Sequence, residues 1–268
     1  MQANIQAHSA IGQPGRSIGE KLMGPRNTYA RLIGVLFLIG FLTYGVGLTL
    51  VNSVITVPDF LSGIPAVQTT LILGAVLMLG NTVVDIGKGV LFFPILENHG
   101  KRTALVYLAA IVVQVVFLNL GVIFLLMLVP LANIAADAGA SSAAWAPGVG
   151  ALLSESNTVA YNVGQAILCF GGVFLAILLF RTRLIPRVLA GLGVVGYLLH
   201  AVGSISEIFG LPLELYLLIP GALFELGIAF WLIIKGFNSA AVAEGLTTAA
   251  IVDRAGPAEA PAPIAVAT

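Results

Sequence analysis

Charge is the scarcest property of this sequence. Only 9% of its 268 residues are Asp, Glu, Lys or Arg, against about 25% in soluble domains. A chain with so few charges and 59% hydrophobic residues cannot cover itself with a water-compatible surface, so the composition indicates a membrane protein. The formal net charge is zero, which excludes a global field that would attract nucleic acid.

Cysteine and histidine are almost absent as well. The single cysteine, Cys169, excludes an internal disulfide and any site with several cysteine ligands, and we interpret it as a small buried hydrophobe. The three histidines lie in separate regions of the chain, which argues against a three-histidine zinc site. We therefore predict no catalytic, cofactor-binding or metal site from motifs, and no cofactor.

Long apolar runs take the place of these features. Residues 32–51 contain 20 residues without a charge, enough for a helix to cross the roughly 30 Å hydrocarbon core. Backbone groups in hydrocarbon must pair within the segment, so each spanning run is predicted to be helical. The sequence predicts an all-α protein with six transmembrane helices, at 32–51, 69–95, 103–129, 157–180, 188–209 and 215–234.

The basic residues predict how these helices are threaded. Eleven of the twelve Lys and Arg residues fall on one side of a six-span arrangement, and the twelfth is Lys88. The loops 52–68, 130–156 and 210–214, on the other side, contain none. The positive-inside rule then predicts that both termini are cytoplasmic. Tyr29, Tyr107 and Trp231 fall near the predicted cytoplasmic interface, as expected for an aromatic belt.

Two tails flank the predicted membrane domain, which covers residues 29–237. Residues 1–28 are polar and are predicted to form a mobile cytoplasmic tail. Residues 238–268 are rich in Ala and Pro and are predicted to form a disordered cytoplasmic tail, because they cannot bury a core. The loop 130–156 is rich in Ala and Gly, and we expect at most a short interfacial helix there.

The second predicted helix contains two charges, Asp85 and Lys88. Its fourteen Leu, Ile, Val and Phe residues contribute about −4 to −8 kcal/mol to insertion, and the two central charges cost about 2.5 to 3.5 kcal/mol each. The sum is near zero, so both groups must pair, lose their charge or face the interior of the bundle. Asn81 lies four residues before Asp85 on the same helical stripe, which is predicted to point inward.

Hairpin geometry extends this polar stripe into a cluster. Residues equally far from a short turn lie at equal depth in neighbouring antiparallel helices. With turns centred near Gly100, Leu184 and Pro212, one level near the midplane collects the polar residues Asp85, Gln114, His200 and Glu225. The candidate intramembrane cluster is therefore Asp85, Lys88, Gln114, His200 and Glu225, with the secondary members Asn81, Asn119, Tyr161, Gln165, Tyr197 and Glu207.

Each part of the cluster has a structural and a functional interpretation. Asp85 and Lys88 form either a structural pair or part of a transport or chemical site, since ionisable groups inside a membrane indicate function by default. His200 and Glu225 are predicted to form an imidazolium–carboxylate pair or a proton relay. For Gln114, Asn119 and Gln165 the structural interpretation, hydrogen bonds between helices, is favoured.

The segment GLGVVG at 191–196 matches a dinucleotide-binding pattern only superficially. That pattern requires a preceding strand and the start of a helix, whereas these glycines lie inside a predicted membrane helix. Close helix packing is the favoured explanation.

The second half of the chain resembles a known family. The segments RTRLIPRVLAGLG at 181–193 and PGALFELGIAFWLIIKGF at 220–237, with YARLIGVLFLI at 29–39, are similar to the uncharacterised bacterial membrane-protein family named domain of unknown function 4386. The resemblance covers about residues 29–237 and implies six spans. It implies no substrate, cofactor or catalytic residue.

Three classes of function follow from these observations. The favoured class is a non-catalytic component of a bacterial plasma (inner) membrane. The alternative is a small transporter or permease for a lipid-like or small polar molecule, with a midplane polar site, and the second alternative is an intramembrane enzyme. A structural role predicts that all polar groups pair off and leave no wet cavity. The expected partner is the lipid bilayer, with a homo-oligomer or another membrane protein left open, and no nucleic acid.

Overall fold

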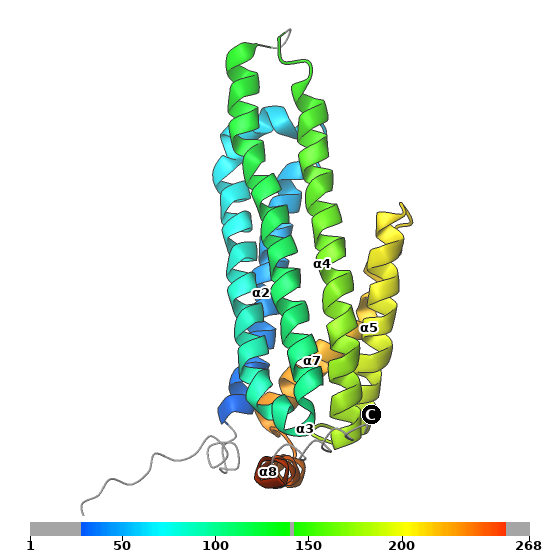
Figure 1. Ribbon diagram of the computed structural model, residues 1–268. Coiled ribbons are helices and arrows are strands. Elements are labelled where there is room, and N and C mark those ends of the chain that lie inside the picture. The colour runs from blue at the N-terminus through cyan, green and yellow to red at the C-terminus, as the bar shows by residue number, and fades with distance from the viewer. Residues whose placement is uncertain (1–27, 140–141, 256–268) are drawn as a thin grey trace, which may run out of the picture.

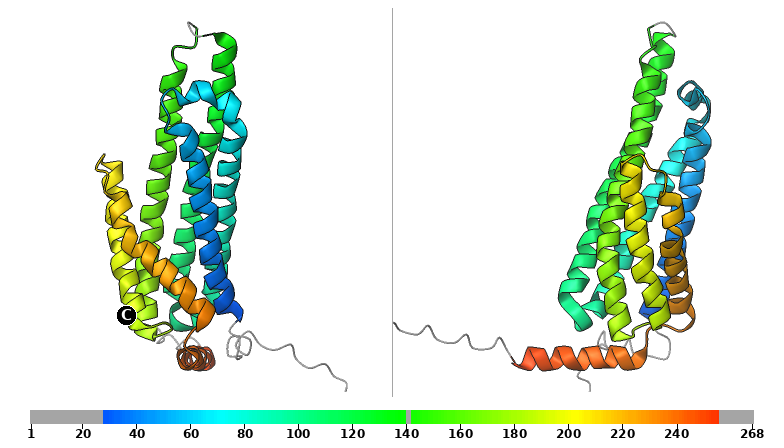
Figure 2. Two further views of the ribbon diagram at one scale, coloured as in Figure 1. Left: turned by 180° about the vertical axis from the view of Figure 1, so that it is seen from behind. Right: turned by 90° about the vertical axis from the view of Figure 1, so that its right-hand side faces the viewer.

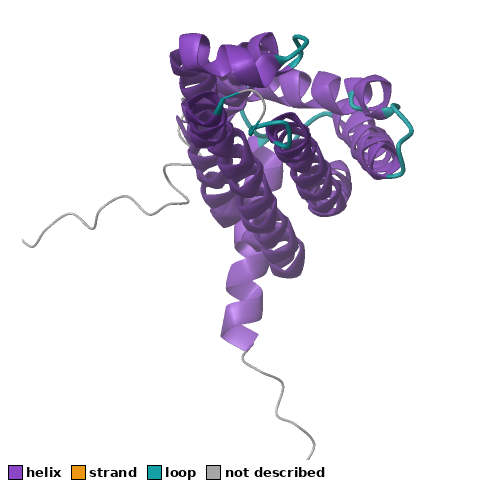
Figure 3. Ribbon diagram, turned by 90° about the horizontal axis from the view of Figure 1, so that it is seen from above, coloured by secondary structure: helices purple, strands orange, loops and turns teal. Residues whose placement is uncertain are grey.

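The computed structural model describes residues 28–139 and 142–255, and every regular element within them is a helix. Most of the helices stand roughly parallel in a bundle, the helix before the last is inclined to them, and the last helix lies across one end (Figures 1, 2 and 3). Their bounds are α2 Thr28–Ile55, α3 Phe60–Ala138, α4 Ala146–Thr182, α5 Arg187–Ile208, α6 Glu214–Leu217, α7 Ile219–Ile234 and α8 Ser239–Ala255.

Helix α3 is a hairpin of two antiparallel arms. Its backbone leaves helical geometry at Gly100, with φ 176° and ψ 81°, and also at Val67. The arm before Gly100 (68–99) and the arm after it (101–138) lie side by side in Figure 1. The predicted helices 69–95 and 103–129 occupy these two arms, so the turn expected near Gly100 is present.

The composition of these helices indicates a membrane-embedded protein. Within the described residues, five helical segments are long and apolar enough to cross a membrane: Thr28–Ile55, Phe60–Ala138, Ala146–Thr182, Arg187–Ile208 and Glu214–Ile234. Large apolar side chains such as Leu42 and Val83 are 65% and 71% exposed on the outside of the bundle. Such a surface suits hydrocarbon and not water.

Two segments differ from the sequence-based expectation. The loop predicted at 130–156 is largely helical, because α3 continues to Ala138 and α4 begins at Ala146. The disordered tail predicted at 238–268 is wrong for Ser239–Ala255, which form α8. Alanine, abundant in both segments, has the highest helix propensity. The tail predicted at 1–28 lies outside the described residues, apart from Thr28, the first residue of α2.

Glycines bring pairs of helices into close contact. A Cβ atom on Gly196 of α5 would lie 2.7 Å from the Cα atom of Gly221 in α7, and one on Gly193 would lie 2.8 Å from the Phe224 ring. Both glycines belong to the GLGVVG segment, so its interpretation as a helix-packing segment is confirmed. Gly47 of α2 and Gly74 of α3 are paired in the same way, because a Cβ atom added to either would lie 2.8 Å from the carbonyl oxygen of the other.

The apolar core is divided into two layers. One is centred on Phe92, whose ring makes edge contacts with Phe37, Tyr107 and Phe237. Tyr107 is only 2% exposed, so its predicted place in the interfacial aromatic belt is wrong: its ring packs against Phe92 instead. The other layer includes Leu71, Met78, Val122 and Leu125. Along the first arm of α3, the buried polar residues Asn81, Thr82 and Asp85 lie between these two layers.

Candidate functional site

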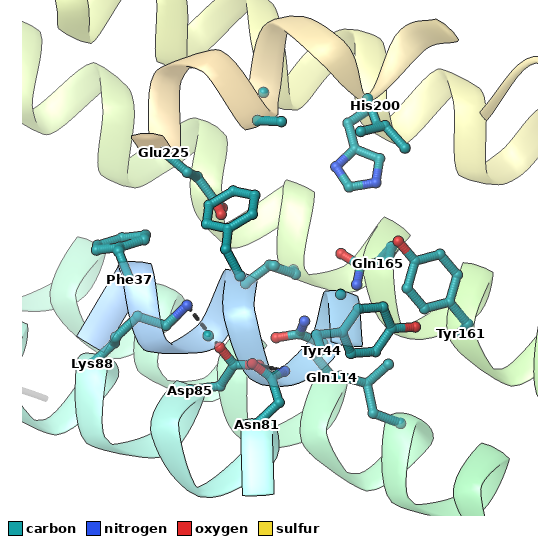
Figure 4. A pocket seen from close by; sticks show the side chains of 18 residues that line it. Phe37, Tyr44, Asn81, Asp85, Lys88, Gln114, Tyr161, Gln165, His200 and Glu225 are labelled. Carbon is teal, nitrogen blue, oxygen red and sulfur yellow. Dashed lines mark hydrogen bonds and ion pairs between the residues drawn. The ribbon is translucent and has the colours of Figure 1, made fainter. Parts of the chain in front are cut away.

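A cavity of about 200 Å³ lies within the polar layer of the bundle (Figure 4). It is lined from α2, both arms of α3, α4, α5 and α7, so most of the bundle contributes to it. The five members of the candidate cluster all line it, together with three of the secondary residues. The polar lining consists of Tyr44, Asn81, Asp85, Lys88, Gln114, Tyr161, Gln165, His200 and Glu225.

An ion pair forms one wall of this cavity. The Nζ atom of Lys88 lies 2.7 Å from Oδ1 of Asp85, and the Asn81 amide donates a hydrogen bond of 3.0 Å to Oδ2 of the same carboxylate. The three side chains share one stripe of α3, as the spacing predicted. The Lys88 ammonium also lies 4.5 Å from the centre of the Phe37 ring, which adds a cation–π contact.

Space for this polar stripe comes from a glycine on the facing helix. A Cβ atom on Gly40 of α2 would lie 3.2 Å from Oδ1 of Asn81 and 3.8 Å from Nζ of Lys88. A larger side chain at this position would press on the polar groups. The ion pair is thus sheltered from lipid by α2, and Asp85 is only 6% exposed.

The opposite wall carries a carboxylate from α7. Oε1 of Glu225 accepts a hydrogen bond of 3.0 Å from the Tyr197 hydroxyl of α5. Tyr197 is 1% exposed, and its ring fills the space beside Gly172 of α4, where a Cβ atom would lie only 2.8 Å from it. The tyrosine is therefore held rigidly, and it orients the Glu225 side chain toward the cavity (Figure 4).

His200 has a different partner from the one predicted. Its Nε2 atom lies 3.4 Å from Oε1 of Glu214, and the predicted ion pair with Glu225 is not formed in the described residues. The alternative, a proton relay between His200 and Glu225, stays a prediction. The cause of the contact with Glu214 is the chain reversal after α5: a Cβ atom on Gly203 would lie 3.0 Å from the Cα atom of Glu214, so α6 folds back onto α5. Nε2 and Oε1 have no hydrogen-bond partner of good geometry in the part of the chain that is described.

The remaining wall is formed by amide and aromatic side chains. Gln114 is 3% exposed, and its Oε1 atom has no hydrogen-bond partner among the described residues. The Tyr44 ring stacks on the Tyr161 ring, with the ring centres 5.7 Å apart. Gln165 lies beside them on α4 (Figure 4).

Three of the secondary residues lie outside the cavity lining. Tyr197 supports Glu225 from behind, as described above. Oε2 of Glu207 accepts a long hydrogen bond of 3.5 Å from the backbone nitrogen of Glu214, and Asn119 lies further along the second arm of α3. Asn119 Oδ1 is buried without a hydrogen-bond partner in the described residues.

Sequence reasoning missed two polar residues at or beside the site, Tyr44 and Glu214. Tyr44 lies in the middle of an uncharged run, and its hydroxyl at midplane depth was the available signal. Glu214 falls in the predicted loop 210–214, where a carboxylate looks solvated. Nothing in the local sequence shows that α6 returns this residue toward α5.

The charges and rings of the cavity favour a small cation. Asp85 and Lys88 offset each other, which leaves the Glu225 carboxylate in excess, and Phe37, Tyr44 and Tyr161 present aromatic rings. Carboxylates, amide oxygens and aromatic faces all attract ammonium groups. The described residues include no group of three or more His, Cys, Asp and Glu side chains placed to hold a metal ion.

Comparison with known protein families gives a match over most of the chain. A family described as "Domain of unknown function (DUF4386)" matches residues 32–236, well over half of the chain. The match includes every residue that lines the cavity. No curated protein and no solved structure matches the sequence.

Proposed function

Since the chain belongs to the DUF4386 family, whose description assigns no activity, we propose a function from the residues that line the cavity. The protein is a small multi-pass carrier or permease that binds a small, positively charged polar solute. Glu225 provides the charge that the solute meets. Gln114, Tyr44 and Tyr161 surround it with a hydrogen-bond acceptor and aromatic faces. This proposal is the transporter interpretation of the sequence, and it adds that the solute carries a positive charge.

The observation that carries the proposal is a roomy polar cavity with incompletely paired groups. One water needs about 10–15 Å³ of such space and two to four polar partners, and this cavity has about 200 Å³. Polar side chains that serve only to hold helices together bond to one another across the interface. Here the Gln114 side-chain carbonyl has no hydrogen-bond partner among the described residues, and Nε2 of His200 has only its ion-pair contact of 3.4 Å with Glu214.

The proposed carrier crosses the membrane six times. Helices α2, α4 and α5, the two arms of α3, and α6 with α7 would each cross once, which places both ends of the domain on one side. The described basic residues outside the cavity gather at the end of the bundle that holds the Gly100 turn (Figure 1). By the positive-inside rule this end is cytoplasmic, in a bacterial plasma membrane.

A thermal-shift experiment tests the proposed binding. The purified protein in detergent is heated with small solutes of three classes: alkylammonium ions, carboxylates and neutral polyols. A ligand present at a hundred times its Kd stabilises the folded state by about 2.7 kcal/mol, so a cation that binds raises the Tm. Glu225→Gln removes the charge that attracts it, and Glu207→Gln removes a carboxylate outside the cavity lining as the matched control.

The expected result is a rise in Tm with ammonium solutes for the parent and for Glu207→Gln, and none for Glu225→Gln. Gln114→Leu serves as a second cavity variant if Glu225→Gln folds poorly. No rise with any class, or an equal rise in Glu225→Gln, contradicts the proposal. A lower Tm of Glu225→Gln without any solute effect favours the non-catalytic structural role instead.

A further inference from the structure

A second pocket, of about 580 Å³, lies at the end of the bundle where α4, α5 and α7 end or begin. We propose that it binds a phosphate group, supplied by the headgroup of an anionic phospholipid. Its lining includes the basic residues Arg183, Arg187 and Lys235 and the indole of Trp231, and no acidic residue. This inference is independent of the cation proposed for the central cavity.

The three cations are free to bind an anion. The ion pairs of the described residues are Asp85 with Lys88 and His200 with Glu214, so none of these three basic side chains has a carboxylate partner there. Arg187 is held by its position 5.4 Å from the centre of the Phe180 ring. The planar guanidinium groups of arginines without a carboxylate partner match the oxygen geometry of a phosphate.

The backbone around the pocket is fixed by contacts between two turns. The Asn238 side-chain amide donates to the Arg183 carbonyl at 3.3 Å, and the Asn238 backbone nitrogen donates to the Leu184 carbonyl at 3.0 Å. These bonds join the turn between α4 and α5 to the turn between α7 and α8. The first turn of α5 also begins here, and its free backbone N–H groups add positive potential.

The position of the pocket, at the ends of the proposed membrane helices, points to a lipid as the source of the phosphate. Arg183 and Arg187 flank the turn between two membrane helices, and Lys235 directly follows the last residue of α7. Trp231, one turn inside α7, is the residue type that settles at the boundary between hydrocarbon and headgroups. Basic pockets between helices at this level recognise anionic headgroups.

Native mass spectrometry of the detergent-solubilised protein tests the site. Phosphatidylglycerol and phosphatidylcholine are added in turn, and inorganic phosphate and glycerol 3-phosphate are added in separate samples. The variant Arg183→Gln/Arg187→Gln/Lys235→Gln is compared with Arg31→Gln/Lys101→Gln/Arg102→Gln, which removes three exposed cations from the same end of the bundle.

The expected result is preferential retention of phosphatidylglycerol by the parent and by the control variant. Binding falls by about fivefold for each removed cation of the pocket. Equal losses in the two variants overturn the site. Binding of free phosphate or glycerol 3-phosphate at the same three cations overturns the assignment to a lipid.

Trp231 supplies an independent readout, because the chain has only one other tryptophan, Trp145. In the Trp145→Phe background, brominated phosphatidylglycerol is expected to quench Trp231 fluorescence more strongly than brominated phosphatidylcholine. Neutralising the three pocket cations in that background should remove the difference. Equal quenching by both lipids in the Trp145→Phe protein contradicts the proposal.

Discussion

The Lys88 ammonium lies 2.7 Å from the Asp85 carboxylate inside the helix bundle, and the Asn81 amide holds the other carboxylate oxygen. Removing one partner leaves the other charge buried and unpaired, which costs about 3–5 kcal/mol. Lys88→Met and Asp85→Asn are therefore each expected to lower the Tm in detergent strongly. The double variant removes both charges and keeps an oxygen at position 85 that accepts from Asn81, so it should be closer to the parent than either single variant. If the decrease in Tm of the double variant equals the sum of the decreases of the two single variants, the two charges do not depend on each other.

A second prediction concerns the contact between α5 and α7. Gly196→Ala places a methyl group 2.7 Å from the Cα atom of Gly221, and overpacking of this kind costs about 1–3 kcal/mol. We expect a lower Tm and a lower folded yield. The matched control is Gly80→Ala, also in a helix interior, where nothing lies within 4 Å of the added atom and alanine is the better helix former. Equal behaviour of the two variants would argue against the observed contact.

The third prediction concerns the attachment of α8 to the bundle. His99, at the Gly100 turn, has Nδ1 2.9 Å from the Ile95 carbonyl and Nε2 2.9 Å from the Ala241 carbonyl. His99→Leu removes the bond to α8, and hydrogen exchange in α8 should rise while exchange in α4 stays unchanged. The neighbouring Asn98→Leu is the control, because in the described part of the chain the Asn98 side chain donates its hydrogen bond within α3, to the Pro94 carbonyl. Slow exchange of α8 in His99→Leu would mean that other contacts hold it.

Much of the site was predictable because, in a hairpin of two helices, residues equally far in sequence from the turn lie at equal depth in the membrane. Asp85 and Gln114 lie nearly equally far from Gly100, and the structure places both on one cavity. The same argument brought His200 and Glu225 to this level. Here the chemistry of hydrocarbon restricts the backbone to helices, so the periodicity of the chain is enough to place polar residues.

Pairing within the cavity was not predictable in the same way. Depth alone put Glu225 opposite His200, whereas the neighbour of His200 is Glu214. That contact depends on α6 folding back over Gly203. This is a tertiary contact, and the periodicity of the sequence gives no sign of it. Helix α8 was missed for a related reason. An Ala-rich segment looks disordered in the sequence, and its helix depends on tertiary contacts such as the one between His99 and the Ala241 carbonyl.

The most direct test of the central claim is charge displacement by the protein in a membrane. Proteoliposomes are adsorbed on a solid support, and a small alkylammonium ion is added while the current is recorded. The account predicts a saturable current for the parent and for Glu207→Gln, and its loss in Glu225→Gln. No current with any small cation, or an undiminished current in Glu225→Gln, would contradict a cation site at this carboxylate.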